Sequence, residues 1–133
     1  MKRILLAYDG SEPARRALSQ TIQLAVAFSA HVGVVSVVPT GGSSRALDPW
    51  ENRTVHAAEL LEARATLRQA GIEPELFEPA GDPARSIERI AREGGFDTVV
   101  LGSRGLTGIA RALSGSVSDH VATHARATVV VTR

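Results

Sequence analysis

Short, almost entirely apolar runs recur along this chain and alternate with longer segments of helical periodicity. Arg3–Tyr8, His31–Val38, Thr98–Leu101 and Thr128–Thr132 are such runs, and they are too apolar for strands with one face in water. Strands buried on both faces and alternating with helices are typical of an open parallel sheet with helices on both of its faces. Because 133 residues fit one hydrophobic core, the pattern predicts a single α/β domain over residues 1–133.

Helix signals lie between these runs. Ser11 offers an N-cap with Pro13 in the first turn, and an inward face of small and apolar residues continues from there to Phe28. A second helix is expected from about Arg53 to Ala70, with Gly71 as its left-handed stop. Both helices show the three-to-four-residue apolar spacing of a helix that packs on a sheet.

The remaining segments complete the alternation. Asp82 is expected to cap a third helix that ends at Gly94, and Ser116–Ala125 reads as a short fourth one. Glu73–Glu78 is a short polar strand with proline near both ends, which is typical of a protected sheet edge. The composition of Thr40–Asn52, rich in Gly, Ser, Asp and Pro, predicts the one long loop.

Composition excludes several kinds of function. The chain has fourteen arginines but a single lysine, Lys2, so it lacks the interior lysine of a Walker A loop or a Schiff base. A net charge of +1 gives no electrostatic reason to expect nucleic acid as a partner. Without cysteine there are no disulfides or thiolate metal sites, and no apolar run approaches the length of a membrane span. The first apolar run stops at Asp9, too early for a signal peptide, which predicts a cytoplasmic protein.

Glycines and hydroxyl residues gather after the fourth apolar run. Four glycines fall within fourteen residues: Gly102, Gly105, Gly108 and Gly115. Backbone amides at a helix N-terminus bind phosphate without any lysine, and Ser116 stands where the last helix is expected to begin. Ser103 and Arg104 add a hydroxyl and a guanidinium donor. Simple turns would also use glycine, but this density favours a ligand-binding segment.

The spacing Gly102-x2-Gly105-x9-Gly115-Ser116 is similar to the nucleotide-binding signature of the universal stress protein family. The opening Ile4–Glu12 resembles the first strand and turn of that family, and the segment from Gly115 to Val131 resembles its last helix and strand. The resemblance covers essentially the whole chain. It implies an open five-stranded sheet in the order 3-2-1-4-5 that binds ATP, with Mg or Mn, where the strand order reverses. It also implies a homodimer, for which the edge strand Thr128–Thr132 is available.

The same resemblance implies roles for individual residues. Asp9 is expected near the ribose or near a divalent metal bound to the nucleotide, although an Asp-Gly after a strand can also be turn chemistry alone. The backbone of Val37 is expected to meet the adenine. The other residues expected to line the ribose and phosphates are Ala7, Tyr8, Leu101, Gly102, Ser103, Arg104, Gly105, Gly115, Ser116 and Val117. No residue stands out as a strong general base, so any ATP hydrolysis is expected to be slow.

Two other functions fit part of the sequence. A dimeric interaction module that binds no nucleotide would use the edge strand Thr128–Thr132. An adenylyl-transferring enzyme would need a Ser-Gly-Gly or His-Gly-His motif after an early strand, and Gly41-Gly42-Ser43 follows the second strand rather than the first. His120 and His124 have metal-ligand spacing but no third partner, which favours a solvated helix face. Trp50 either covers a ligand or partner site or folds back onto the domain.

Overall fold

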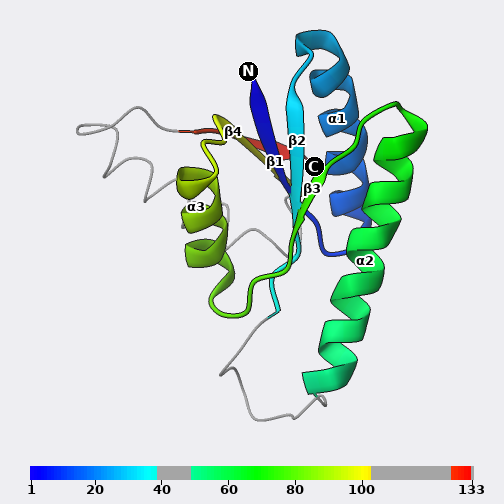
Figure 1. Ribbon diagram of the computed structural model, residues 1–133, viewed down its shortest axis with the longest axis vertical. Helices are drawn as coiled ribbons and strands as arrows, with labels where there is room; N and C mark the ends of the chain where they lie inside the picture. The colour runs from blue at the N-terminus through cyan, green and yellow to red at the C-terminus, as the bar shows by residue number, and fades with distance from the viewer. Residues whose placement is uncertain (39–48, 103–126, 133) are drawn as a thin grey trace.

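Five parallel strands form one sheet, with helices on both of its faces (Figure 1). This computed structural model describes residues 1–38, 49–102 and 127–132. The strands are β1 (Arg3–Ala7), β2 (His31–Val35), β3 (Glu75–Phe77), β4 (Thr98–Gly102) and β5 (Thr128–Thr132). The helices are α1 (Glu12–Phe28), α2 (Pro49–Gln69) and α3 (Pro83–Glu93). The strand order β3-β2-β1-β4-β5 confirms the expected topology.

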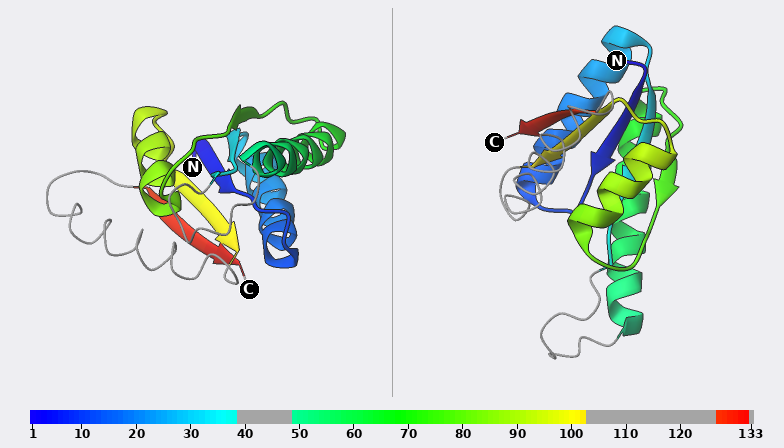
Figure 2. Two further views of the ribbon diagram at one scale, coloured as in Figure 1. Left: turned by 90° about the horizontal axis from the view of Figure 1, so that it is seen from below. Right: turned by 90° about the vertical axis from the view of Figure 1, so that its left-hand side faces the viewer.

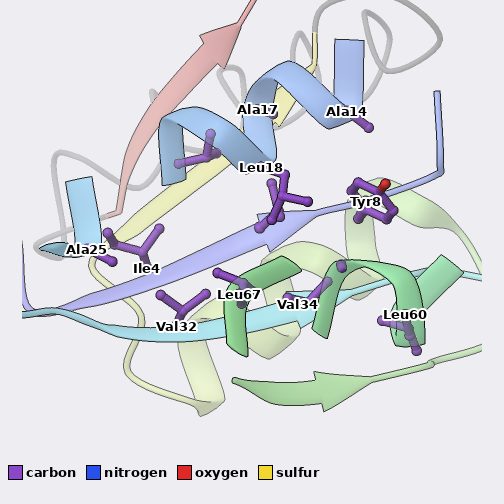
Figure 3. Close-up of a cluster of buried hydrophobic side chains, with 13 residues drawn as sticks. Ile4, Tyr8, Ala14, Ala17, Leu18, Ala25, Val32, Val34, Leu60 and Leu67 are labelled. Atoms are coloured by element: carbon purple, nitrogen blue, oxygen red, sulfur yellow. The ribbon is translucent and has the colours of Figure 1, made fainter. Parts of the chain in front are cut away.

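The core lies on both faces of the sheet because successive strand residues point to opposite sides. Ile4 and Leu6 of β1 pack under α1 and α2 together with Leu67, as Figure 3 shows for most of this cluster. Leu5 and Ala7 point the other way, toward α3. Every residue of β4 is buried, as expected for a central strand covered on both faces.

The predicted helix caps are confirmed. The Ser11 hydroxyl accepts a hydrogen bond from the Ala14 amide at 3.2 Å, and the Asp82 carboxylate accepts one from the Arg85 amide at 3.0 Å. Gly71 has a φ of +80°, the left-handed conformation expected of a stop after α2. Local chemistry therefore decides where these helices begin and end.

Two boundaries differ from the predictions by more than two residues. α2 begins at Pro49, so Trp50 lies in a helix rather than in the loop expected to run to Asn52. The prediction followed the polar composition of this segment, but proline is favoured in the first turn of a helix, and here the helix begins at the proline. β2 ends at Val35, and Val38 forms only an isolated parallel bridge with Ala80.

The prediction that Phe28 faces the core is wrong. Its exposed fraction is 56%, and Ala25 is the last buried residue of α1. Beyond Ala25, the last turn of α1 therefore contributes no buried side chain to the core. Among the helices that the structure describes, none combines the length and the apolar character of a membrane span.

Candidate functional site

The carboxyl ends of β1, β2 and β4 meet at one edge of the sheet. β1 pairs with β2 on one side and with β4 on the other, so the strand order reverses between β1 and β4. In open α/β sheets, ligands bind at the carboxyl edge where this reversal occurs. Asp9 follows β1 there, and Gly102 is the last residue of β4. The structure thus brings together two of the residues expected at a nucleotide.

The Asp9–Gly10–Ser11 turn links β1 to α1. The Asp9 Oδ1 atom accepts a hydrogen bond from the Ser11 amide at 3.0 Å, and Gly10 has a φ of +75°, which a residue with a side chain rarely adopts. Within the described residues, the second carboxylate oxygen of Asp9 makes no hydrogen bond. Asp9 therefore combines turn chemistry with one oxygen to which no described residue donates.

Gly102 allows α1 to lie directly on the end of β4. A Cβ atom at this position would lie 2.7 Å from the carbonyl carbon of Pro13 and 2.9 Å from the amide nitrogen of Ala14. These are backbone atoms of the first helical turn, and they cannot rotate away. Close helix–strand packing is one of the reasons for glycine in nucleotide-binding turns of α/β sheets. Gly102 consequently has a structural role whether or not a ligand also approaches it.

The other described residues predicted at the site offer mainly their backbones. The side chains of Ala7 and Leu101 are buried in the cluster under α3, and Val37 packs against the same cluster. Tyr8 points to the opposite face, where its hydroxyl donates to the Glu62 Oε1 atom of α2 at 3.0 Å. Burial and the bond to Glu62 raise the pKa of Tyr8 against the opposing effect of Arg15. These four residues could meet a ligand only through main-chain atoms or the exposed part of Val37.

Half of the predicted nucleotide contacts lie outside the described residues. They are Ser103, Arg104, Gly105, Gly115, Ser116 and Val117. His120 and His124 also lie there. In the described part of the chain, no group of three or more acidic or histidine side chains has an arrangement that could hold a metal ion.

Sequence reasoning missed a hydrogen-bonded cluster beside this turn, formed by Ser36, His56 and Glu59. Ser36 follows β2, and its Oγ atom lies 2.7 Å from the Nδ1 atom of His56 and donates to the Glu59 Oε2 atom at 3.3 Å. The same Nδ1 atom lies 3.1 Å from Glu59 Oε2. Ser36 is buried, and the side chains of His56 and Glu59 are only 16% and 17% exposed. No motif in the sequence signals this cluster, because Ser36 lies twenty residues before His56.

The Ser36–His56–Glu59 cluster is not arranged for nucleophilic catalysis. In a catalytic triad the serine and the acid contact opposite nitrogens of the imidazole. Here Ser36 and Glu59 both contact Nδ1. Burial raises the pKa of Glu59, and the charge of Asp9 raises it further, while His56 and Ser36 lower it without cancelling the rise. The arrangement anchors Glu59 rather than activating Ser36.

A groove of about 680 Å³ lies elsewhere, between β3 and the end of α3. Its rim carries Glu75, Glu78 and Glu93 against one cation, Arg89. It contains none of the residues predicted at a nucleotide, and three carboxylates disfavour a phosphate there. The reversal point at Asp9 and Gly102 is therefore the better candidate site.

Comparisons with known proteins agree with this geometry. The profile of the Universal stress protein family matches residues 1–133. The universal stress protein YxiE of Bacillus subtilis is 30% identical over 145 residues, which cover 98% of each protein. A solved universal stress protein in complex with cAMP is 27% identical, with a TM-score of 0.68, and the match covers 99% of this chain and 97% of that one. The Archaeoglobus fulgidus universal stress protein in complex with dAMP is 25% identical, with a TM-score of 0.75 and coverage of 100% and 98%.

Proposed function

Because this chain belongs to the universal stress protein family, we propose that it binds ATP as a regulatory or signalling ligand in a cytoplasmic stress response. One observation carries the proposal: at the carboxyl end of β1, beside the end of β4, where the strand order reverses, Asp9 has a carboxylate oxygen that no described residue engages. The complexes of two relatives with cAMP and dAMP support an adenine nucleotide as the ligand class.

Each part of the nucleotide has proposed contacts. The second carboxylate oxygen of Asp9 accepts a hydrogen bond from a ribose hydroxyl or binds a Mg or Mn ion on the phosphates. The backbone of Val37 contacts the adenine. The phosphates are held without lysine, by backbone amides, hydroxyls and one guanidinium. The residues proposed to line the ribose and phosphates are Ala7, Tyr8, Leu101, Gly102, Ser103, Arg104, Gly105, Gly115, Ser116 and Val117.

Binding rather than rapid turnover is the proposed use of this site. A fast hydrolase needs a general base or a positioned lysine or metal cage near the phosphates. The chain has no interior lysine, and the one serine–histidine contact described beside the site is not arranged as a nucleophile and base. We therefore expect ATP hydrolysis to be slow at most.

A homodimer paired through β5 is part of the same proposal. β5 forms the outer edge of the described sheet beside β4, as Figure 2 shows. Val131 is 44% exposed on this strand, which carries no charged residue. Long uncharged edge strands pair readily with a second chain. Light scattering across a range of concentrations tests this part, and a monomer throughout would contradict it.

Equilibrium binding of ATP to nucleotide-free protein tests the proposed function. We expect Asp9→Asn to weaken binding about tenfold, because the amide keeps the turn acceptor but loses the charge. Asp82→Asn is the control: Asp82 is another carboxylate between a strand and a helix that accepts a backbone amide hydrogen bond, and asparagine caps a helix equally well. No measurable binding at millimolar ATP with magnesium would refute the proposal. Unchanged affinity in Gly115→Val would refute the assignment of the phosphates to the glycine segment.

A further inference from the structure

Glu59 of α2 lies beside the Asp9–Gly10 turn, although α2 begins about forty residues later in the chain. We propose that Glu59 is a positioning residue of the nucleotide site, which holds this turn in its binding conformation and keeps the free Asp9 oxygen directed away from α2. The inference rests on the proposed function for its effect on nucleotide affinity. Its effect on the turn itself can be measured without nucleotide.

The contact between Glu59 and Gly10 is close. A Cβ atom at Gly10 would lie 3.2 Å from Glu59 Cγ and 3.3 Å from Glu59 Oε1. The end of the Glu59 side chain therefore lies against the turn, and a side chain at position 10 would displace it by a few tenths of an ångström. The φ of +75° is what requires glycine at position 10.

Glu59 is itself held from two elements. Ser36, at the end of β2, donates to its Oε2 atom at 3.3 Å, and the Nδ1 atom of His56, one turn earlier in α2, lies 3.1 Å away from the same oxygen. A carboxylate that is mostly buried needs such partners to offset its desolvation. Since both partners contact Oε2, the Oε1 atom is left on the side of Gly10. The side chain thus connects the end of β2, α2 and the β1–α1 turn.

The charge of Glu59 also acts on Asp9. The two carboxylates repel one another. The Ser11 amide holds one Asp9 oxygen in the turn, so repulsion disfavours rotation of the other toward α2. The free oxygen is consequently more stable when it faces the sheet edge, where the ribose or metal is proposed to bind.

Glu62 provides a matched control on the same helix. It lies one turn further along α2 and binds Tyr8 and Arg15, at 3.0 Å and 3.2 Å. Glu62 is thus a carboxylate that ties α2 to β1 and α1 without touching the Asp9–Gly10 turn. Loss of Glu62 reports the effect of weaker helix docking alone.

The test compares Glu59→Ala, Glu59→Gln and Glu62→Ala by two measurements. Amide hydrogen exchange at Ser11, followed by NMR without nucleotide, reports the turn, and calorimetric titration with ATP reports the site. We expect Glu59→Ala to speed exchange at Ser11 and to weaken ATP binding about tenfold, as loss of a supporting residue commonly does. Glu59→Gln fills the same space and still accepts from Ser36, so it should restore Ser11 exchange. It lacks the charge that repels Asp9, so ATP affinity should recover only in part. Glu62→Ala should leave Ser11 exchange near wild type.

Two outcomes would overturn the inference. One is unchanged Ser11 exchange in Glu59→Ala, whether or not ATP binds. The other is an equal effect of Glu62→Ala, which would show that helix docking alone is responsible. If the wild type binds no ATP, the proposed function fails while the exchange experiment still decides the role of Glu59. Should Glu59→Ala not fold, His56→Ala removes one anchor of the carboxylate and should change Ser11 exchange in the same direction.

Discussion

Replacing Gly102 by alanine separates the packing role of this glycine from its proposed role at the ligand. The added Cβ would lie 2.7 Å from the Pro13 carbonyl carbon and 2.9 Å from the Ala14 nitrogen. Contacts between such atoms are normally about 3.5–4.0 Å, so the first turn of α1 must move away by about 1 Å. That turn is fixed by the Ser11 cap and by the Arg15 amide bond to the Ser11 carbonyl at 2.9 Å.

The expected cost follows from this geometry. Overpacking a well-packed site costs about 1–3 kcal/mol, and the upper half of this range applies because the opposing atoms are backbone. Gly102 does not have a positive φ, so no conformational strain adds to the clash. We therefore expect Gly102→Ala to lower the free energy of unfolding by about 2–3 kcal/mol.

Urea unfolding of the nucleotide-free protein measures this cost, with Gly71→Ala as the control. Gly71 has a φ of +80° and no atom near its missing Cβ, so alanine there should cost only about 1 kcal/mol from backbone conformation. A Gly102→Ala variant within about 0.5 kcal/mol of wild type would refute the packing argument. Reduced ATP affinity without reduced stability would instead assign Gly102 to the ligand alone.

Three further predictions concern stability. The pKa of Tyr8 is raised in the folded protein, so Tyr8 contributes to the free energy of unfolding below about pH 10, and this contribution is lost as pH rises through the folded pKa. Tyr8→Phe should flatten the dependence of the free energy of unfolding on pH in this range. The absorbance of Tyr8, the single tyrosine of the chain, follows the titration. Although burial raises the pKa of Asp97, amide hydrogen bonds from Lys2 and Arg3 hold it lower overall. Asp97→Ala should therefore cost about 1 kcal/mol near neutral pH, and urea unfolding should show this difference shrinking below about pH 4. Leu67 of α2 is fully buried between this helix and the sheet, so Leu67→Ala should cost about 3 kcal/mol; a loss under about 1 kcal/mol would show that the core there collapses around the cavity.

Local signals in the sequence predicted most of the fold. Apolar runs predicted the strands, and the caps Ser11 and Asp82 predicted where two helices begin. These signals succeed because caps and strand burial depend on a few neighbouring residues. The resemblance to a family supplied the strand order, which the structure confirms. The same reasoning failed at Phe28, where the position of the helix end relative to the sheet decides burial. It also failed at the start of α2, where Pro49 begins the helix before the polar segment ends.

The sequence by itself determined an α/β sheet, its helix caps and the position of Asp9 at the end of a strand. Only the tertiary structure decided what surrounds that aspartate. The approach of α1 makes Gly102 necessary for packing, and the docking of α2 brings Glu59 and His56 to Ser36 and Gly10. These contacts join residues twenty to ninety positions apart, and they depend on where whole helices lie on the sheet. No local pattern of residue types encodes such placement, because it results from packing of the entire core.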